Sequence, residues 1–562
     1  MRHKSNRRTW PGVSLMAIGI AGLLLPAGIV RAAEYRRLPV KEYRDRMKGG
    51  WIGQIVGVTW GGPTEGKFRD VIMPADKMPP WKPELLNDAF GQDDLYVEMT
   101  FLRTLEEHGF DVSIRQAGID FANSEYRLWC ANNVGRSNLR DGIAPPDSSH
   151  PKFHRCVNDI DYQIEADFAG LICPGLPNTV IELGEKFGRL MNYGDGMYAG
   201  QFMGALYAEA FFESDPVRLV EVALKSIPAE SQYAEMARDV LRWYRESPDD
   251  WEKTWHLCEA KYFKNPTYHR DCTDIIEVKI NGAYVLIGLL YGKRDPDQTV
   301  IISCRCGKDS DCNPSSAAGV LFTSIGHAAL PERFTKGLDQ ERKFSHTAYS
   351  FPGLLDVCEK LARQAVVRAG GKIEKNADGE EILMIPVQTV KPSALEKSWA
   401  PGPIANSRFT EEELARIRIL GPKLGLKRFA PGWEIEDYEK GSDITLHREM
   451  GGRPNVYLSR PRGNKSCTLS RTIEIPANKQ TTLTLDVGHD GKHPWTLRVT
   501  ADDEELMKKV ISPETAADGW VSVSVDLSKH AGRRATLKLI QSPGGDKPAG
   551  SAYWGRIAIE SK

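Results

Sequence analysis

Glycines recur at every fourth position of one segment near the beginning of the chain: Gly49, Gly53, Gly57 and Gly61. Residues four apart share one face of an α-helix, so these glycines form a stripe that carries no side chains. Another helix can approach such a stripe closely. A membrane-dimerisation motif is the alternative, but polar residues interrupt the segment and it is too short to span a bilayer. The stripe therefore predicts a helix packed tightly against a second helix.

Helical patterns continue through the first part of the chain. The segments in which apolar residues follow a helical period are residues 206–212, 217–224, 233–244, 281–291 and 354–367. No run of strands with alternating apolar and polar residues interrupts them. We therefore expect residues 34–372 to form one mainly α-helical region.

The pattern changes after residue 371. Residues 373–432 contain many prolines and one short apolar stretch, which indicates a packed connector. From residue 433 to residue 562, short runs alternate apolar and polar residues between glycine-containing turns, and this predicts a β-sandwich. Tryptophans here are candidates for stacking on sugars, but the alternation assigns most of them to the core. They are Trp433, Trp495, Trp520 and Trp554.

The first 33 residues have the pattern of a secretory signal peptide. Basic residues precede an apolar run over residues 13–30, and the small residues Ala32 and Ala33 follow it. A retained membrane anchor is the alternative, but Pro26 and the small residues favour removal. Cleavage after residue 33 removes five basic residues and no acids, so the formal net charge falls from −1 to −6. We expect a secreted or periplasmic protein that binds neither nucleic acid nor, after cleavage, a membrane.

The cysteines are too sparse for a scaffold built on disulfide bonds. An export route permits such bonds without assigning them. Cys130 with Cys156 and Cys258 with Cys272 are the plausible local pairs.

Two acids, Asp309 and Asp311, stand just before a helical segment that opens with small residues. Asn313 is the expected N-cap, Pro314 suits the first turn, and the helical pattern runs over residues 317–330. The positive end of a helix dipole favours negative charge at this place. From this segment alone, acids that cap the helix and acids that bind a cation are both open interpretations.

A second acidic pair, Asp93 and Asp94, opens another predicted helix. Adjacent carboxylates repel and raise each other's pKa unless a cation neutralises them. Two such pairs favour convergence of Asp93, Asp94, Asp309 and Asp311 on a hard divalent cation with oxygen ligands.

These acidic helix starts, together with residues 57–66, resemble the ADP-ribosylglycohydrolase family. Further motifs that resemble the family follow in its order, at residues 165–172, 194–198, 211–215, 227–229 and 281–283. Together they cover roughly residues 40–370, which is the size of one large domain.

The resemblance implies an orthogonal all-α bundle with a magnesium centre of one or two ions at its rim. The metal ligands that it implies are Asp93, Asp94, Asp309 and Asp311. It also implies that the metal binds sugar hydroxyls while water attacks the anomeric carbon. The catalytic residues that it implies are Glu65, Asp94 and Asp311. Glu65 would polarise that water or steady the positive charge that develops at C1. The expected substrate-binding residues are Gly194, Asp195, Gly196 and Met197.

Some positions depart from the family pattern. Gln92 and Leu95 stand where hydroxyl residues usually flank the first acidic pair, and Cys312 stands where Thr or Ser usually ends the second. A thiol is a poor magnesium ligand, so we expect Cys312 to stay outside the metal shell. Tyr198 follows Met197, where the family often has an arginine that suits a diphosphate.

These features predict a secreted, metal-dependent glycoside hydrolase that cleaves a C1–O or C1–N bond of a glycan or small glycoside. The export signal, the missing arginine and the β-sandwich, which is a candidate carbohydrate-binding domain, favour this function. A hydrolase of ADP-ribosylated protein is one alternative. A non-catalytic carbohydrate-binding protein on a degenerate hydrolase fold is another, because the hydroxyl positions beside the acids have changed.

Overall fold

The computed structural model describes residues 34–269, 274–438, 442–544 and 550–562. The expected signal peptide, residues 1–33, lies outside this part of the chain. Across the described residues, no helix combines the length and the apolar character that crossing a membrane requires.

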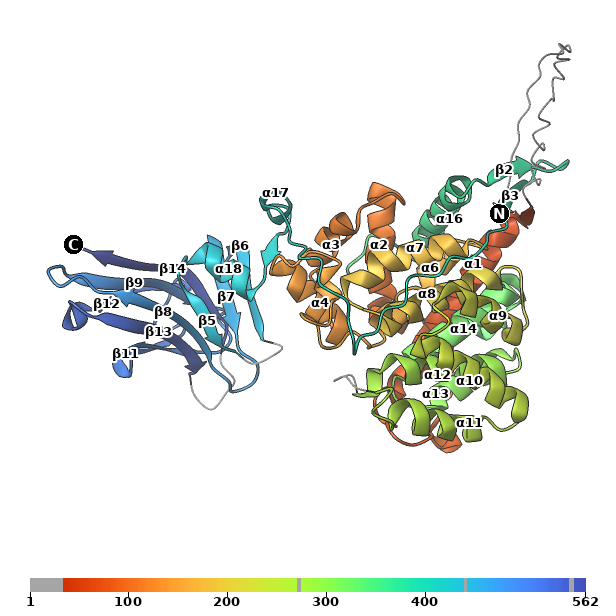
Figure 1. Ribbon diagram of the computed structural model, residues 1–562, viewed down its shortest axis with the longest axis horizontal. Helices are drawn as coiled ribbons and strands as arrows, with labels where there is room; N and C mark the ends of the chain where they lie inside the picture. Colours follow the sequence, from red (N-terminus) through yellow and green to blue (C-terminus); the bar gives the residue numbers. More distant parts are fainter. Residues whose placement is uncertain (1–33, 270–273, 439–441, 545–549) are drawn as a thin grey trace, which may run out of the picture. The chain divides into compact units, whose positions relative to one another are not determined.

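Helices form the region that precedes residue 370, as the helical periods predict (Figure 1). Their bounds are α1 Val40–Gly61, α2 Asp93–His108, α3 Ile114–Ala122, α4 Cys130–Arg140, α5 Asp161–Ile164, α6 Asp167–Leu171, α7 Pro177–Phe187, α8 Asp195–Ala210, α9 Pro216–Ala223, α10 Gln232–Glu246, α11 Trp251–Cys258, α12 Val278–Tyr291, α13 Pro296–Arg305, α14 Cys312–Ile325, α15 Glu332–Thr335 and α16 Phe351–Arg368. The helical character expected of this region is confirmed.

A small antiparallel sheet joins the two ends of the helical region. Its strands are β1 (Tyr35–Pro39), β2 (Lys372–Lys375) and β3 (Glu381–Pro386), in the order β1-β3-β2. Strand β3 is the short apolar stretch of the predicted connector, and its Leu383 and Ile385 are buried. The connector is therefore tied back to the strand that precedes α1.

The remaining chain forms two antiparallel sheets, which confirms the predicted β architecture. Its elements are α17 Glu411–Leu414, β4 Ile419–Leu420, α18 Pro422–Phe429, β5 Glu434–Asp437, β6 Asp443–Met450, β7 Arg453–Arg460, β8 Cys467–Glu474, β9 Thr481–His489, β10 Trp495–Ala501, β11 Glu504–Ile511, β12 Trp520–Asp526, β13 Arg534–Pro543 and β14 Ala552–Ser561. The sheet orders are β11-β10-β13-β8-β5 and β12-β9-β14-β7-β6-β4. One core joins both sheets and buries Trp433, Trp495 and Trp554, whereas Trp520 is half-buried.

Of the two plausible disulfide pairs, Cys130 with Cys156 is not formed, because Cys130 is a free thiol. The other pair includes Cys272, which lies outside the described residues. Cys258 is buried, and a buried thiol packs as a small apolar group.

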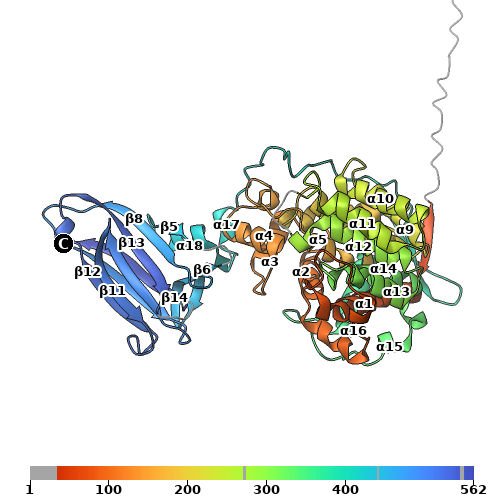
Figure 2. The ribbon, with the colours of Figure 1, turned by 90° about the horizontal axis from the view of Figure 1, so that it is seen from below.

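The glycine stripe packs α1 against α14, and this confirms the helix contact predicted from its spacing (Figure 2). A Cβ atom added at Gly49, Gly53, Gly57 or Gly61 would lie only 2.5, 2.3, 2.2 or 2.0 Å from a backbone oxygen. The oxygens belong to Phe322, Ala318, Pro314 and Ser310, in that order. Residue numbers rise along one partner and fall along the other, so the segments run antiparallel with their backbones in contact.

We expect Gly57→Ala to destabilise the protein by about 1–3 kcal/mol, because the added methyl group meets the Pro314 backbone rather than a flexible side chain. The better helix propensity of alanine offsets only about 1 kcal/mol of this effect. Chemical denaturation followed by circular dichroism measures the change. Gly91→Ala is the control, since a Cβ there meets nothing within 4 Å; a Gly57→Ala protein as stable as this control would contradict the prediction.

Candidate metal centre

The loop after α1 is bound to the loop before α14. A hydrogen bond of 2.7 Å joins the hydroxyls of Thr64 and Ser310. The Gly66 amide donates to the Lys308 carbonyl at 3.0 Å, and the Lys308 amide donates to the Phe68 carbonyl at 2.7 Å. These bonds extend the contact made by the glycine stripe, and they bring the acids of both loops together.

Asp311, rather than Asn313, is the N-cap of α14. Its Oδ1 accepts a hydrogen bond of 3.0 Å from the Cys312 amide, and the helix runs from Cys312 to Ile325. The Nδ2 of Asn313 instead donates to Asn281 at 2.8 Å. The predicted cap and the predicted helix end were therefore wrong. Pro314 lies in the first turn, as predicted. Amide groups there have no acceptor within the helix, so a proline costs no helical hydrogen bond.

The two acidic helix starts meet at one buried cluster. Ligand atoms of Asp309, Asp311 and Cys312 all lie within 4.8 Å of one another. The Cys312 thiol donates to Oδ1 of Asp94, at the start of α2, with a distance of 3.0 Å. The other oxygen of Asp94, Oδ2, is buried and accepts no hydrogen bond from the described residues. A buried carboxylate oxygen without a donor suits a site that receives a cation.

The carboxylates of this cluster act on one another electrostatically. Burial and the Asp311 charge raise the pKa of Asp93, and burial with the Asp93 and Asp311 charges raises the pKa of Asp94 well above its usual value. The Asp311 charge, partial burial and the Asp93 charge raise the pKa of Glu65 to about 7. Burial and the Asp311 charge likewise raise the pKa of Asp309 well above its usual value. Such mutual repulsion fits a hard divalent cation bound through carboxylate oxygens.

Further acids adjoin the cluster and were not assigned a role from the sequence. Asp161 accepts a short hydrogen bond from the Asn132 amide, and burial raises the pKa of Asp161 to about 7. Burial and the Asp161 charge raise the pKa of Glu165 well above its usual value. The Asp93 charge raises the pKa of both Asp161 and Glu165 further. Glu165 Oε2 and Asn132 Oδ1 are buried without a hydrogen-bond partner among the described side chains and backbone. The only sequence signal was the position of Glu165 within a motif that resembles the family.

The predicted substrate-binding residues open α8. Gly194 has a φ of 58°, and Asp195 Oδ1 accepts a hydrogen bond of 2.9 Å from the Tyr233 amide, at the start of α10. A Cβ on Gly196 would lie 2.2 Å from the Val157 carbonyl, and Met197 is fully buried. These contacts fix local packing, and a role in substrate binding stays a prediction for all of them.

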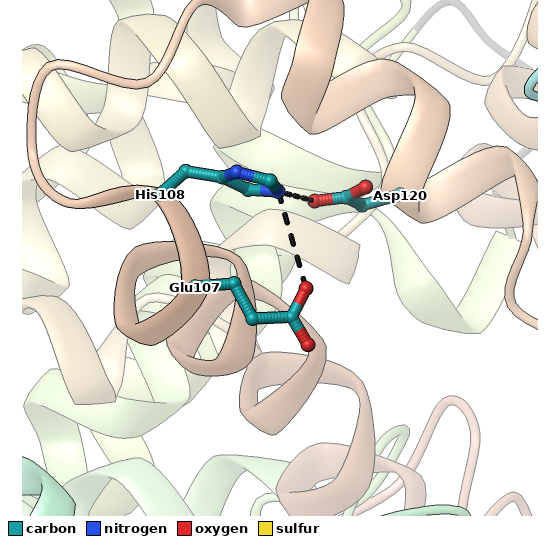
Figure 3. Close-up of side chains that lie close together, drawn as sticks. All are labelled: Glu107, His108 and Asp120. Carbon is teal, nitrogen blue, oxygen red and sulfur yellow. Dashed lines mark ion pairs between the residues drawn. The ribbon is translucent and has the colours of Figure 1, made fainter.

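A second group of possible ligands lies at the other end of α2. His108 Nε2 is 3.3 Å from Asp120 and 3.9 Å from Glu107, and Figure 3 shows the imidazole directed toward both carboxylates. Thr104 and Gln116 donate to the two oxygens of Asp120 at 3.0 and 2.7 Å. Since Asp120 is already satisfied and Glu107 is exposed, this group is a surface ion pair and carries no metal assignment.

A family model described as ADP-ribosylglycohydrolase matches residues 39–370. The chain belongs to the ADP-ribosylglycohydrolase family. Membership makes it a hydrolase of the glycohydrolase type, and this family generally depends on divalent metal. The match covers the helices that carry both acidic pairs, so it includes the whole candidate metal centre.

Comparison with other proteins adds only slight likenesses. No curated protein matches the chain. An ADP-ribosylglycohydrolase-related protein complex is 15% identical with a TM-score of 0.38, covering 58% of this chain and 99% of that one. The CBM22-1 xylan-binding domain of Xyn10C from Paenibacillus barcinonensis is 12% identical with a TM-score of 0.19, covering 24% of this chain and 87% of that domain. A cyclase from Fischerella sp. TAU is 15% identical with the same TM-score, covering 24% of this chain and 86% of the cyclase. Likenesses this slight carry no argument about function.

We expect a divalent cation to raise the thermal midpoint of the native protein, and Asp311→Asn to abolish that rise. At about 100 times its Kd a ligand stabilises the native state by about 2.7 kcal/mol. Asparagine still caps a helix, so Asp311→Asn removes one charge of the cluster and keeps the N-cap of α14. Differential scanning calorimetry with the metal chloride or with EDTA measures the effect.

Glu107→Gln is the matched control, because it removes an acid from the surface ion pair. It should keep the full cation-induced shift. An equal shift in Asp311→Asn and Glu107→Gln would place the cation outside the cluster.

Proposed function

We propose that the protein is a magnesium-dependent glycoside hydrolase, exported by residues 1–33, that cleaves a C1–O or C1–N bond of a glycan or small glycoside. The observation that carries the proposal is the convergence of the exposed Glu65 with the buried Asp94 and Asp311 in one acidic cluster, within the part that matches the family. Asp93, Asp94, Asp309 and Asp311 would hold the ion. A bound magnesium ion supplies a Lewis acid that holds vicinal hydroxyls and lowers the pKa of water.

Glu65 is the proton-transfer group of this proposal. It is exposed, whereas Asp94, Asp309 and Asp311 are buried. Its pKa of about 7 suits a group that accepts a proton from the attacking water near neutral pH and passes it to the departing oxygen or nitrogen. As the C1–O or C1–N bond breaks, the Glu65 carboxylate would also offset the positive charge that develops at C1.

The charges around the site support the proposed substrate class. The charged side chains that shift the pKa values of Glu65, Asp93, Asp94 and Asp309 are acids. Lys308, next to Asp309 in sequence, lies 3.1 Å from Glu259 and 3.7 Å from Asp70 instead. A diphosphate needs cationic partners, whereas sugar hydroxyls donate readily to carboxylates, so the surroundings favour a sugar over ADP-ribose.

The exposed Trp129 is the aromatic side chain that suits a sugar best near this site. It is the N-cap of α4, directly before the segment whose Ala131 and Asn132 amides donate to Asp159 and Asp161. Pyranose rings stack on exposed indole faces through their apolar C–H groups. The Arg127 guanidinium lies 4.6 Å from the centroid of the Trp129 ring, so a sugar would stack on the opposite face.

We expect Glu65→Gln to lower kcat on a cleaved glycoside by about 10²–10⁴-fold, the usual contribution of a proton-transfer group. Magnesium affinity should change far less than kcat. Parallel assays of the magnesium-loaded protein with aryl glycosides, nucleosides and ADP-ribosyl peptides identify the substrate. Glu107→Gln is the control for the loss of an exposed carboxylate.

Release of ADP-ribose without turnover of any glycoside would replace this proposal by the ADP-ribosyl-protein hydrolase. Binding of glycans with no turnover of any compound, in wild type and Glu65→Gln alike, would favour the non-catalytic alternative.

We expect Cys312→Ser to tighten magnesium binding by about tenfold or more, the scale on which neighbouring groups tune metal sites. The substitution exchanges the thiol beside Asp94 for a hydroxyl, whose oxygen is the harder ligand. Isothermal titration with magnesium measures the affinity. Cys467→Ser, a buried thiol of the β-sandwich, is the control; unchanged affinity in Cys312→Ser would show that residue 312 does not reach the ion.

A further inference from the structure

An arginine-lined cavity of about 430 Å³ lies where α17, α18 and the six-stranded sheet meet. Its charged lining residues are Arg418, Arg428, Arg448 and Arg556, and no aspartate or glutamate lines it. The volume falls within the range of small-ligand sites, about 300–1,000 Å³. The concentration of positive charge is unusual in a chain whose formal net charge is −1.

The regular pairing of strand β14 with its neighbours is interrupted at this cavity. Strand β14 pairs with β7 only over Ala552–Trp554, and its register with β9 shifts between Trp554 and Arg556. Such a bulge ends one ladder and redirects the side chains that follow it. Asn455 of β7, with Gly555 and Arg556 of β14, lines the cavity beyond the last pair. The cavity is therefore formed by the strand geometry and by α18, which packs on β6 (Figure 1).

The arginines differ in how fully they are neutralised. Arg556 is 2.8 Å from Glu560, Arg418 is 3.6 Å from Glu125, and Arg428 pairs with Glu411. Arg448 donates to the Ala415 carbonyl, and no carboxylate lies within ion-pair distance of it in the described part of the chain. A guanidinium held by one neutral carbonyl retains donors and a full charge for an anion.

Apolar side chains complete the lining, among them Leu414, Ile417, Phe429 and Ile557. A free inorganic anion would pair with arginine and leave this apolar surface uncovered. A pyranose ring with an anionic group covers both, because its C–H face packs on aliphatic side chains while its carboxylate or sulfate faces the guanidinium groups. Charge complementarity thus selects an anionic sugar as the occupant.

We propose that this cavity binds an anionic sugar unit, carrying a carboxylate or a sulfate ester, of the glycan on which the protein acts. The sugar class rests on the proposed hydrolase function, whereas the anionic preference rests on the arginines. The cavity shares no residue with the metal cluster, so it binds the glycan at a second place.

Isothermal titration of the purified protein with trigalacturonate, a κ-carrageenan oligosaccharide, maltotriose and sodium sulfate tests the inference. We expect trigalacturonate or the sulfated oligosaccharide to bind, and the one that binds identifies the anion. Arg448→Gln should weaken that binding by about tenfold, and raising the salt concentration should weaken it further. Arg448→Lys keeps the positive charge but lacks the planar guanidinium group that donates two parallel hydrogen bonds, so it should bind with intermediate affinity.

Arg534→Gln is the matched control, since Arg534 is exposed on β13 of the other sheet. No binding of either acidic oligosaccharide, equal binding by Arg448→Gln and Arg534→Gln, or equal affinity for sulfate alone would overturn the inference. Arginine-dependent binding without hydrolysis of any glycoside would leave this inference standing and remove the catalytic proposal. Hydrolysis of glycosides without arginine-dependent binding would do the reverse.

Discussion

The direct backbone contact between α1 and α14 is the constraint on which the site depends. Glycines allow the helices to approach until a Cβ would lie 2.0–2.5 Å from carbonyl oxygens at four successive turns. Because the contact is antiparallel, the end of α1 meets the beginning of α14. The chain leaving α1 then carries Glu65, and the chain entering α14 carries Asp309 and Asp311. A side chain on the stripe would separate both the helices and these acids.

The contact between α1 and α14 also brings several acidic side chains together in a buried place, which is unfavourable for folding. Burial and like charge raise the pKa values of the acids, because these surroundings disfavour the ionised form of each carboxyl group. Helix starts reduce this cost in part. The amides of Asp93 and Asp94 lower the pKa of Asp93, and the Cys312 amide lowers that of Asp311. The remaining repulsion would favour the uptake of a cation by this cluster.

The spacing of apolar residues and glycines predicted the helices, the sheets and the close contact along the glycine stripe. These features depend on residues that are only a few positions apart. The position of the α14 cap was not predicted. The Asp311 carboxylate accepts the Cys312 amide, whereas the Asn313 side chain donates to Asn281, which is distant in sequence. The pairing of β1 with β3 joins segments more than 340 residues apart, for which no local signal exists. Asp161 and Glu165 likewise reach Asp93 only through space.

In the proposed function, the acidic cluster and the arginine-lined cavity would act on a glycan with opposite charges. Without a cation, the acidic cluster repels an anionic sugar, so binding at the cluster requires that the ion offset the carboxylate charge. The arginine-lined cavity attracts the same sugar whether or not a metal is bound. Under the two proposals, an acidic glycan would associate with the protein through the arginines independently of metal, whereas its cleavage would depend on metal. Affinity and turnover would then respond separately to chelation, which no single charged site would produce.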